Sequence, residues 1–123
     1  MKTDMWQTPD LVPAITYSDL LRAIEWLRRV FGFREREAAR LTRPNGGMAW
    51  IEIGDSLPKI STADDHWPER AQTAAPGVVL KVYVEDVDRH FACAKAEGAS
   101  IVLEPMDGFW GGRLYRVLDH EGY

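Results

Sequence analysis

The sequence predicts an α+β fold in which one strand–helix–strand–strand–strand module is used twice. Two observations lead to this prediction. The same order of elements is found in both halves of the 123 residues, and matching positions recur at a separation of 66 or 67. The recurring pairs are Asp19 and Asp86, Arg22 and Arg89, and Gly32 and Gly98.

The first module begins with a strand and a helix. Residues 12–17 form a β-rich run, and Ser18 or Asp19 follows as a possible helix cap. Apolar residues at three- and four-residue spacing predict the helix, and Gly32 stands where a helix C-cap is expected. The inward-facing residues are Leu20, Ala23, Ile24, Leu27 and Phe31.

Three further strands are expected in this module. Residues 33–41 are read as extended, and the Pro-Asn-Gly-Gly sequence at 44–47 predicts a turn. Residues 48–53 alternate between apolar and mixed positions as a strand does, and residues 57–61 provide the fourth strand. The first module therefore covers about residues 11–61.

The second module begins after a connector over residues 62–77. A β-branched run at 78–84 predicts a strand, and Asp86 and Gly98 bound a helix. Two extended segments follow, at 100–103 and at 112–118. The inward-facing helix residues are Val87, Phe91 and Ala94. We expect one domain over residues 1–123, with the second module at about 78–123.

The last residues predict a strand that the sequence does not contain. Asp119 and Gly122 occupy the first and fourth places of a type I turn, which normally leads into a partner strand. By comparison with the first module, only three of four strands have then been used. We expect the fourth strand to follow Tyr123 in a longer chain. The alternative is that a strand of another chain takes its place.

Composition restricts the class of protein. At 46% apolar and 28% charged residues the chain is typical of one globular domain. A net charge of −4 argues against a nucleic-acid partner. No run approaches the roughly 18 apolar residues of a membrane span, and residues 1–10 lack a secretion signal. Cys93 is the single cysteine, so we expect no internal disulfide and a cytoplasmic location.

Several segments resemble one known superfamily. These are "AIEWL" and "FGF" in the first half, and "VYVEDVDRHFACAKAEGASIVLEP" and "WGGRLYRVLDHEG" in the second. They resemble the glyoxalase I, bleomycin resistance protein and extradiol dioxygenase superfamily, also called vicinal oxygen chelate proteins. The resemblance implies paired βαβββ modules that form a curled mixed sheet around a cavity, with helices outside, commonly in a homodimer.

The resemblance also implies where metal ligands would lie. Metal-dependent members carry His or Gln on the first strand of each module, at positions that correspond here to Val12 and Val79. A Glu is expected on each last strand, where the first module offers Lys59 or Ser61 and the second lies beyond Tyr123. Because such a site needs about three His or carboxylate ligands, we predict no metal and no other cofactor. The three histidines are expected elsewhere, in the connector, on the second helix and in the last turn.

Strand alternation predicts which side chains line the cavity. Met48, Trp50 and Glu52 share one face, and Lys81 and Tyr83 share another with the position of Val79. Aromatic and charged side chains on these faces would suit a flat ligand with a few polar groups. The predicted ligand-binding residues are Met48, Trp50, Glu52, Lys81, Tyr83, Phe109, Trp110, Arg113 and Tyr115. Two of these have structural alternatives: Trp50 as a core residue, and Arg113 as an exposed residue or a partner of Glu52.

Three hypotheses for function follow. The first is a metal-independent protein that binds a small aromatic or partly charged molecule, similar to antibiotic-sequestering bleomycin resistance proteins. The second is a metal-dependent lyase or dioxygenase with displaced ligands, including Glu52. The third is an enzyme without metal in which Glu52 or Tyr83 acts as acid or base. We expect a small-molecule ligand and a homodimer, and no nucleic-acid or membrane partner.

Overall fold

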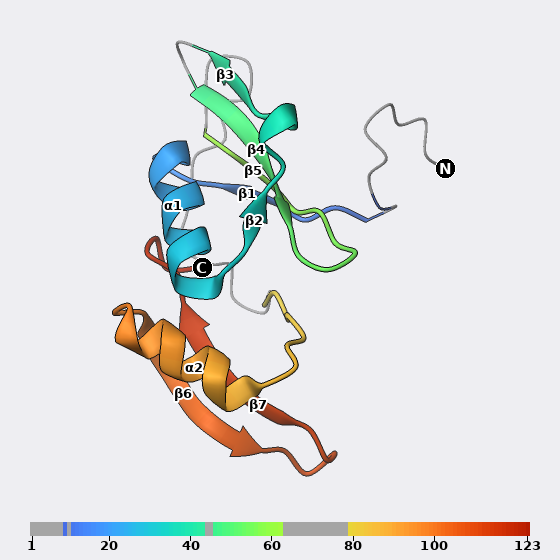
Figure 1. Ribbon diagram of the computed structural model, residues 1–123, viewed down its shortest axis with the longest axis vertical. Coiled ribbons are helices and arrows are strands. Elements are labelled where there is room, and N and C mark those ends of the chain that lie inside the picture. The colour runs from blue at the N-terminus through green and yellow to red at the C-terminus, as the bar shows by residue number, and fades with distance from the viewer. Residues whose placement is uncertain (1–8, 10, 44–45, 63–78) are drawn as a thin grey trace. The chain divides into compact units, whose positions relative to one another are not determined.

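The computed structural model describes residues 9, 11–43, 46–62 and 79–123 (Figure 1). These residues form two compact units. The first contains the described residues up to 28 and those from 33 to 62, and the second contains residues 29–32 and 79–123. Among the described helices, none is long and apolar enough to cross a membrane.

The first unit contains a mixed sheet of short strands. Its order is β1-β5-β4-β2, with β3 also paired to β4. β1 and β5 run parallel, whereas the pairs that β4 makes with β2, β3 and β5 are antiparallel. The strands are β1 (Ala14–Thr16), β2 (Arg34–Glu35), β3 (Leu41–Arg43), β4 (Gly46–Glu52) and β5 (Lys59–Ser61).

The segment at 33–41 was expected to be one strand, and this is wrong. The 3₁₀ turn η1 (Glu37–Ala39) separates β2 from β3, although both strands pair with β4. Within the turn, the N–H groups of Ala39 and Arg40 donate to the carbonyls of Arg36 and Glu37. These local bonds take the place of ladder bonds to β4 over the interrupted stretch.

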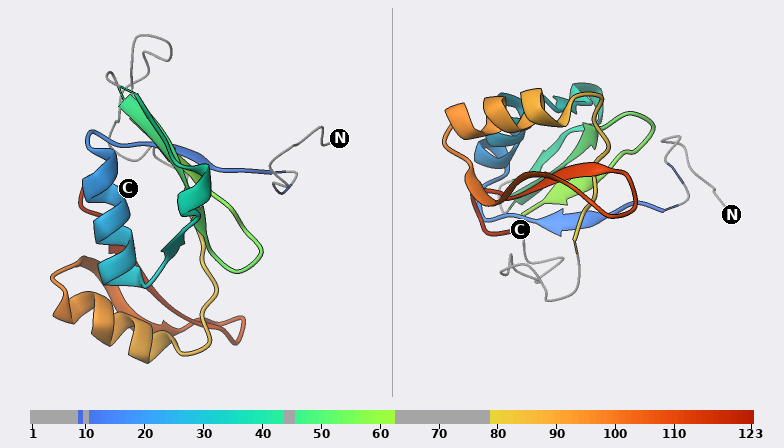
Figure 2. Two further views of the ribbon diagram at one scale, coloured as in Figure 1. Left: turned by 45° about the horizontal axis from the view of Figure 1, so that its top comes forward. Right: turned by 90° about the horizontal axis from the view of Figure 1, so that it is seen from below.

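Helix α1 (Leu20–Phe31) lies along one face of this sheet (Figure 2). Of the two candidate caps, Asp19 makes the capping bond, since its Oδ1 accepts from the Arg22 N–H at 3.0 Å. At the other end Gly32 has a φ of 74°, which favours glycine. The buried face of α1 consists of Leu20, Ala23, Ile24, Trp26, Leu27 and Val30.

One glycine allows α1 and β3 to approach β4 closely. A Cβ atom at Gly47 would lie 2.5 Å from the Leu41 carbonyl oxygen and 3.1 Å from Cδ2 of Leu20. Any larger residue would therefore separate the helix from the sheet. Ala49 and Ile51 continue the same buried face of β4 and complete the core of the first unit.

The second unit is a helix packed on a hairpin. Helix α2 (Val87–Ala96) contacts both β6 (Ser100–Asp107) and β7 (Arg113–Leu118), which pair antiparallel with two register shifts. Asp86 caps α2 with the same bond that Asp19 makes, 3.0 Å from the Arg89 N–H. The two caps therefore share their geometry as well as their spacing in the sequence.

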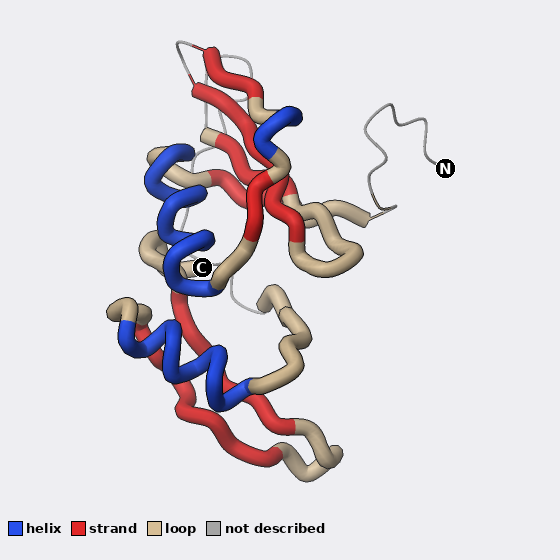
Figure 3. The backbone as a smooth tube through the Cα atoms, in the orientation of Figure 1, coloured by secondary structure: helices blue, strands red, loops and turns tan. Residues whose placement is uncertain are grey.

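The strand expected at 78–84 is not formed over its described part, residues 79–84, which are drawn as loop in Figure 3. The side chains of Val79, Leu80 and Tyr83 are exposed. In the first unit the matching strand β1 pairs in parallel with β5, which is the last strand of that unit. No described residue of the second unit offers such a partner, and strands are stable only as part of a paired sheet.

The last turn has the predicted form. The N–H of Gly122 donates to the Asp119 carbonyl at 3.1 Å, and Gly122 has a φ of 91°. The Asp119 side chain strengthens the turn, because its Oδ1 accepts from the N–H groups of Glu121 and Tyr123 at 2.9 and 3.0 Å.

Candidate functional site

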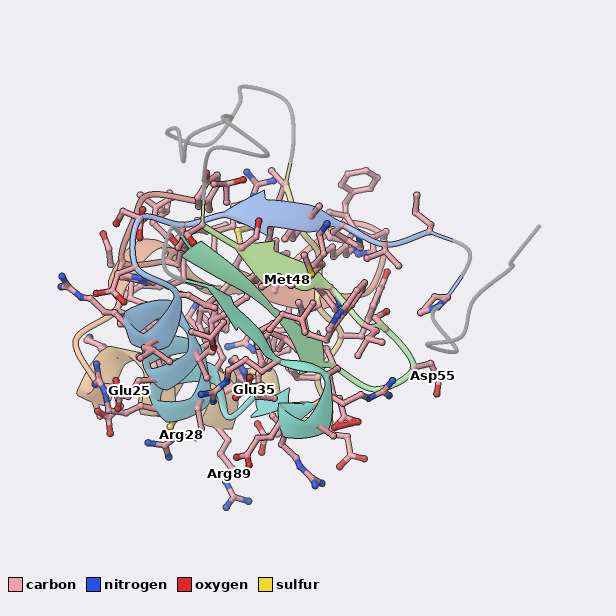
Figure 4. All side chains as sticks on the ribbon, turned by 90° about the horizontal axis from the view of Figure 1, so that it is seen from above. Glu25, Arg28, Glu35, Met48, Asp55 and Arg89 are labelled. Carbon is pink, nitrogen blue, oxygen red and sulfur yellow. The ribbon has the colours of Figure 1, made fainter. Side chains whose placement is uncertain are left out.

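Strand β4 separates core residues from a mixed aromatic and polar surface. Gly47, Ala49 and Ile51 are buried, whereas the alternate residues are only half-buried. Cross-strand pairing extends this second surface, because Trp50 lies opposite Lys59, and Met48 lies opposite Ser61. We call it the Trp50 face, and it consists of Met48, Trp50, Glu52, Lys59 and Ser61; Figure 4 labels Met48.

Glu52 has an arginine neighbour within its own unit. Arg36 Nη2 lies 3.5 Å from Oε2 of Glu52, and the Arg36 backbone N–H donates to the carbonyl of Trp50 at 2.9 Å. Both side chains are half-exposed. The Trp50 face therefore carries an indole beside a loosely paired carboxylate and the Lys59 ammonium.

A part-buried ion pair on the other side of the sheet holds the turn that carries Arg36. Glu35 pairs with Ile51 in register and so faces α1, and its side chain is only 6% exposed. Arg40 donates to both Glu35 oxygens, through Nε at 2.7 Å and Nη2 at 2.5 Å. Sequence reasoning missed this pair, because residues 33–41 were treated as one polar strand.

In the second unit, the loop between β6 and β7 exposes two aromatic side chains. We call residues 108–112 the aromatic loop. Phe109 is 100% exposed and Trp110 is 57% exposed, and their rings meet edge to face with centroids 5.2 Å apart. Backbone bonds close the loop, from the Gly108 N–H to the Gly112 carbonyl at 2.6 Å and from the Gly111 N–H to the Gly108 carbonyl at 3.0 Å.

Arg113 and Tyr115 share a face, as alternation predicts, but both are engaged with α2. The Tyr115 hydroxyl lies 2.6 Å from Nδ1 of His90, and its ring meets that of Phe91 with centroids 5.4 Å apart. Burial raises the pKa of Tyr115. Arg113 is exposed and pairs with Asp88 and Asp107 within its own unit.

Lys81 and Tyr83, the remaining predicted site residues, contact each other. The Lys81 Nζ lies 5.2 Å from the centroid of the Tyr83 ring, which is a cation–π distance. Both side chains are exposed, and Tyr83 is 83% exposed. His90, expected on the second helix, lies on α2 and stacks on Phe31 within the second unit with ring centroids 5.7 Å apart.

The side chains at the positions where the resemblance implies metal ligands are not suited to bind a metal ion. Val12 and Val79 have hydrocarbon side chains, and β5 offers an ammonium group at Lys59 and a neutral hydroxyl at Ser61. Throughout the described part of the chain, no three His, Cys, Asp or Glu side chains lie together in a way that could hold a metal ion.

The fold and the repeated module identify the class of protein. The model of the Glyoxalase/Bleomycin resistance protein/Dioxygenase superfamily matches residues 11–123. The chain belongs to this superfamily.

Solved structures with this fold agree. TioX from Micromonospora sp. ML1 is 34% identical, with a TM-score of 0.70 over 93% of this chain and 90% of that chain. A superfamily member from Sphaerobacter thermophilus DSM 20745 is 18% identical, with a TM-score of 0.64 over 93% of this chain and 92% of that chain. A family enzyme from Burkholderia phytofirmans PsJN is 20% identical, with a TM-score of 0.64 over 89% and 88%. The comparison with curated proteins found no match.

Proposed function

We propose that this protein binds a small, planar aromatic molecule carrying one or more charged groups, without a metal ion, and thereby sequesters it as an antibiotic-resistance protein does. The observation that carries the proposal is the Trp50 face. There a half-buried indole lies between two charged side chains, with Lys59 on the neighbouring strand and Glu52 two residues along β4.

The chemistry of this face matches such a ligand. A tryptophan ring offers a wide apolar surface for stacking, worth about 0.5–1.5 kcal/mol beyond simple burial. Lys59 can pair with an anionic substituent on the ligand. Glu52 can accept a hydrogen bond or pair with a cation, because Arg36 holds it only at 3.5 Å.

Two further findings support a binding protein of this kind. The superfamily includes bleomycin resistance proteins by name, and the similarity to TioX extends over 93% of this chain at 34% identity. The side chains at the metal-ligand positions favour a function that needs no metal. We propose in addition that the protein is a homodimer and that it is cytoplasmic. Light scattering of the purified protein tests whether it is a dimer.

Ligand titration tests the proposal. A panel of planar aromatic antibiotics and simple rings, including 2-naphthoate and uncharged 2-naphthamide, is titrated by calorimetry. We expect Trp50→Ala to weaken binding by about tenfold and Trp50→Phe to retain most of it. Leu21→Ala, which changes an exposed residue of α1, serves as the control.

A second variant tests the charged contact. Lys59→Met keeps most of the side-chain length and removes the charge. It should weaken binding of 2-naphthoate more than that of 2-naphthamide, because only the acid has a negative group to pair. Equal affinities of the wild type and Trp50→Ala for every compound that binds would contradict the proposal.

A further inference from the structure

The Trp110 indole lies against two glycines of the aromatic loop, with its six-membered ring at Gly108 and its Nε1 edge at Gly112. A Cβ atom built on Gly108 would overlap the six-membered ring, at 2.5 Å from Cζ2 and closer still to Cη2 and Cζ3. A Cβ atom on Gly112 would lie 2.5 Å from the indole Nε1. Real Cβ atoms do not approach other atoms so closely, so an alanine at either position would displace the ring.

Backbone conformation does not account for these two glycines. Gly111 lies between Trp110 and Gly112 with a φ of 97°, and a Cβ atom there would meet nothing within 4 Å. Gly108 and Gly112 are not among the glycines with positive φ. Gly111 therefore allows the backbone to turn. Gly108 and Gly112 leave the space that the Trp110 ring occupies.

The loop beneath the indole is held at its base. Its closing bond joins the Gly108 N–H to the Gly112 carbonyl, and Asp107 and Arg113 form the last paired residues of the hairpin. Arg113 also donates to Asp107 at 3.1 Å and to Asp88 of α2 at 3.0 Å. The loop is thus fixed to both strands and to the helix of its unit.

Despite this support, the aromatic surface faces solvent. Trp110 remains 57% exposed with one ring face against the loop, and the adjacent Phe109 is fully exposed. A ring that is already held in place loses little conformational freedom when it binds a ligand. An exposed aromatic pair on a fixed loop is typical of a binding surface rather than of a core.

We infer that Gly108 and Gly112 are positioning residues that let the Trp110 indole lie against the loop, so that the aromatic loop presents a fixed surface on which a planar aromatic ring stacks. This inference rests on the proposed function, since it assigns a second stacking element for the same class of ligand. It adds that the affinity for the aromatic ligand depends on two glycines, Gly108 and Gly112.

The test combines glycine and tryptophan variants of the full chain. Gly108→Ala, Gly112→Ala, Trp110→Ala and the double variant Gly108→Ala/Trp110→Ala are titrated with 2-naphthoate. We expect each single variant to weaken binding by about fivefold. Once the indole is gone, Gly108→Ala should cause no further loss, because nothing remains for its methyl group to displace.

Nuclear magnetic resonance provides a structural measurement that does not depend on any ligand. In the wild type, the Gly108 Hα protons should be shifted upfield by the indole ring, and Trp110→Ala should remove that shift. The Trp110 Nε1–H resonance, assigned with Trp110→Phe, should move in Gly108→Ala and Gly112→Ala. Circular dichroism checks that every variant keeps the wild-type fold.

The outcomes separate this inference from the proposed function. If 2-naphthoate binding depends on Trp50 and is unchanged in both glycine variants, the inference is wrong and the proposed function stands. An additive loss in the double variant, or an absent ring shift at Gly108, overturns the inference as well. If no ring compound binds the wild type, both the proposed function and the stacking role of Trp110 are wrong. The resonance measurements then still decide whether the glycines position the indole.

Discussion

Arg113 donates to both carboxylate oxygens of Asp88, from Nε to Oδ2 and from Nη2 to Oδ1, each at 3.0 Å. This pair connects the first residue of β7 to the first turn of α2. The bonds from Arg113 hold the pKa of the Asp88 carboxyl below its usual value. We therefore expect protonation of Asp88 to weaken the packing of α2 on the hairpin.

The first prediction concerns acid stability. Because the pKa of Asp88 is lower in the folded chain than in the unfolded chain, its contribution is present above the unfolded value of about 3.9 and is lost as pH falls through the folded value. Asp88→Asn should flatten the dependence of the urea midpoint on pH below about 4. Arg113→Lys, which keeps the charge without the paired geometry, should give an intermediate slope. An unchanged slope in Asp88→Asn would refute the assignment.

The second prediction concerns the two helix caps. Asp19→Ala and Asp86→Ala should each lower the free energy of unfolding by about 1 kcal/mol, because each leaves a helix N–H without its acceptor. Asparagine caps as well as aspartate does, so Asp19→Asn and Asp86→Asn are the matched controls. Urea unfolding followed by circular dichroism measures all four variants. Equal losses in the asparagine and alanine variants would mean that charge, not capping, is responsible.

The third prediction concerns the part-buried pair under β2. Arg40→Ala should cost about 2 kcal/mol of unfolding free energy, because the Glu35 carboxylate, only 6% exposed, would lose its charged hydrogen-bond partner. Glu35→Gln/Arg40→Ala should recover part of that loss by removing the unpaired charge. Arg36→Ala is the control, since its pair with Glu52 is longer and half-exposed and should matter by about 0.5 kcal/mol. Equal effects of Arg40→Ala and Arg36→Ala would contradict this account.

The fourth prediction concerns metal ions. After incubation with zinc, nickel, manganese or ferrous iron and exhaustive dialysis, the protein should retain no stoichiometric metal in elemental analysis. The physical reason is that Val12 and Val79 offer no lone pair and Lys59 is a cation. About one retained metal ion per chain would favour the lyase or dioxygenase hypothesis instead.

The Trp50 face and the helix ends could be predicted because each depends on local rules. Alternation along β4 separates Trp50 from Ile51 whatever the rest of the chain does. Asp19 and Asp86 cap their helices through bonds to N–H groups three residues away. Superfamily membership could be predicted as well, because several segments of the sequence resemble those of that superfamily.

What required the tertiary structure is contact between residues that local rules do not connect. The 3₁₀ turn between β2 and β3 accompanies the Glu35–Arg40 pair, whose buried setting is created by packing under the sheet. Alternation grouped Arg113 with Tyr115, but the position of α2 decided which face of β7 is covered.

The sequence by itself determined the superfamily, through the resemblance of its segments. It also determined the two helices with their caps and the residues that share each strand face, because these follow from hydrogen bonds and periodicities within a few residues. Tertiary structure alone decided whether residues 79–84 form a strand, since a strand exists only with a partner. It also decided that the Trp110 indole lies against Gly108 and Gly112. The position of a ring depends on the atoms it meets in space, which the spacing of residues along the chain does not specify.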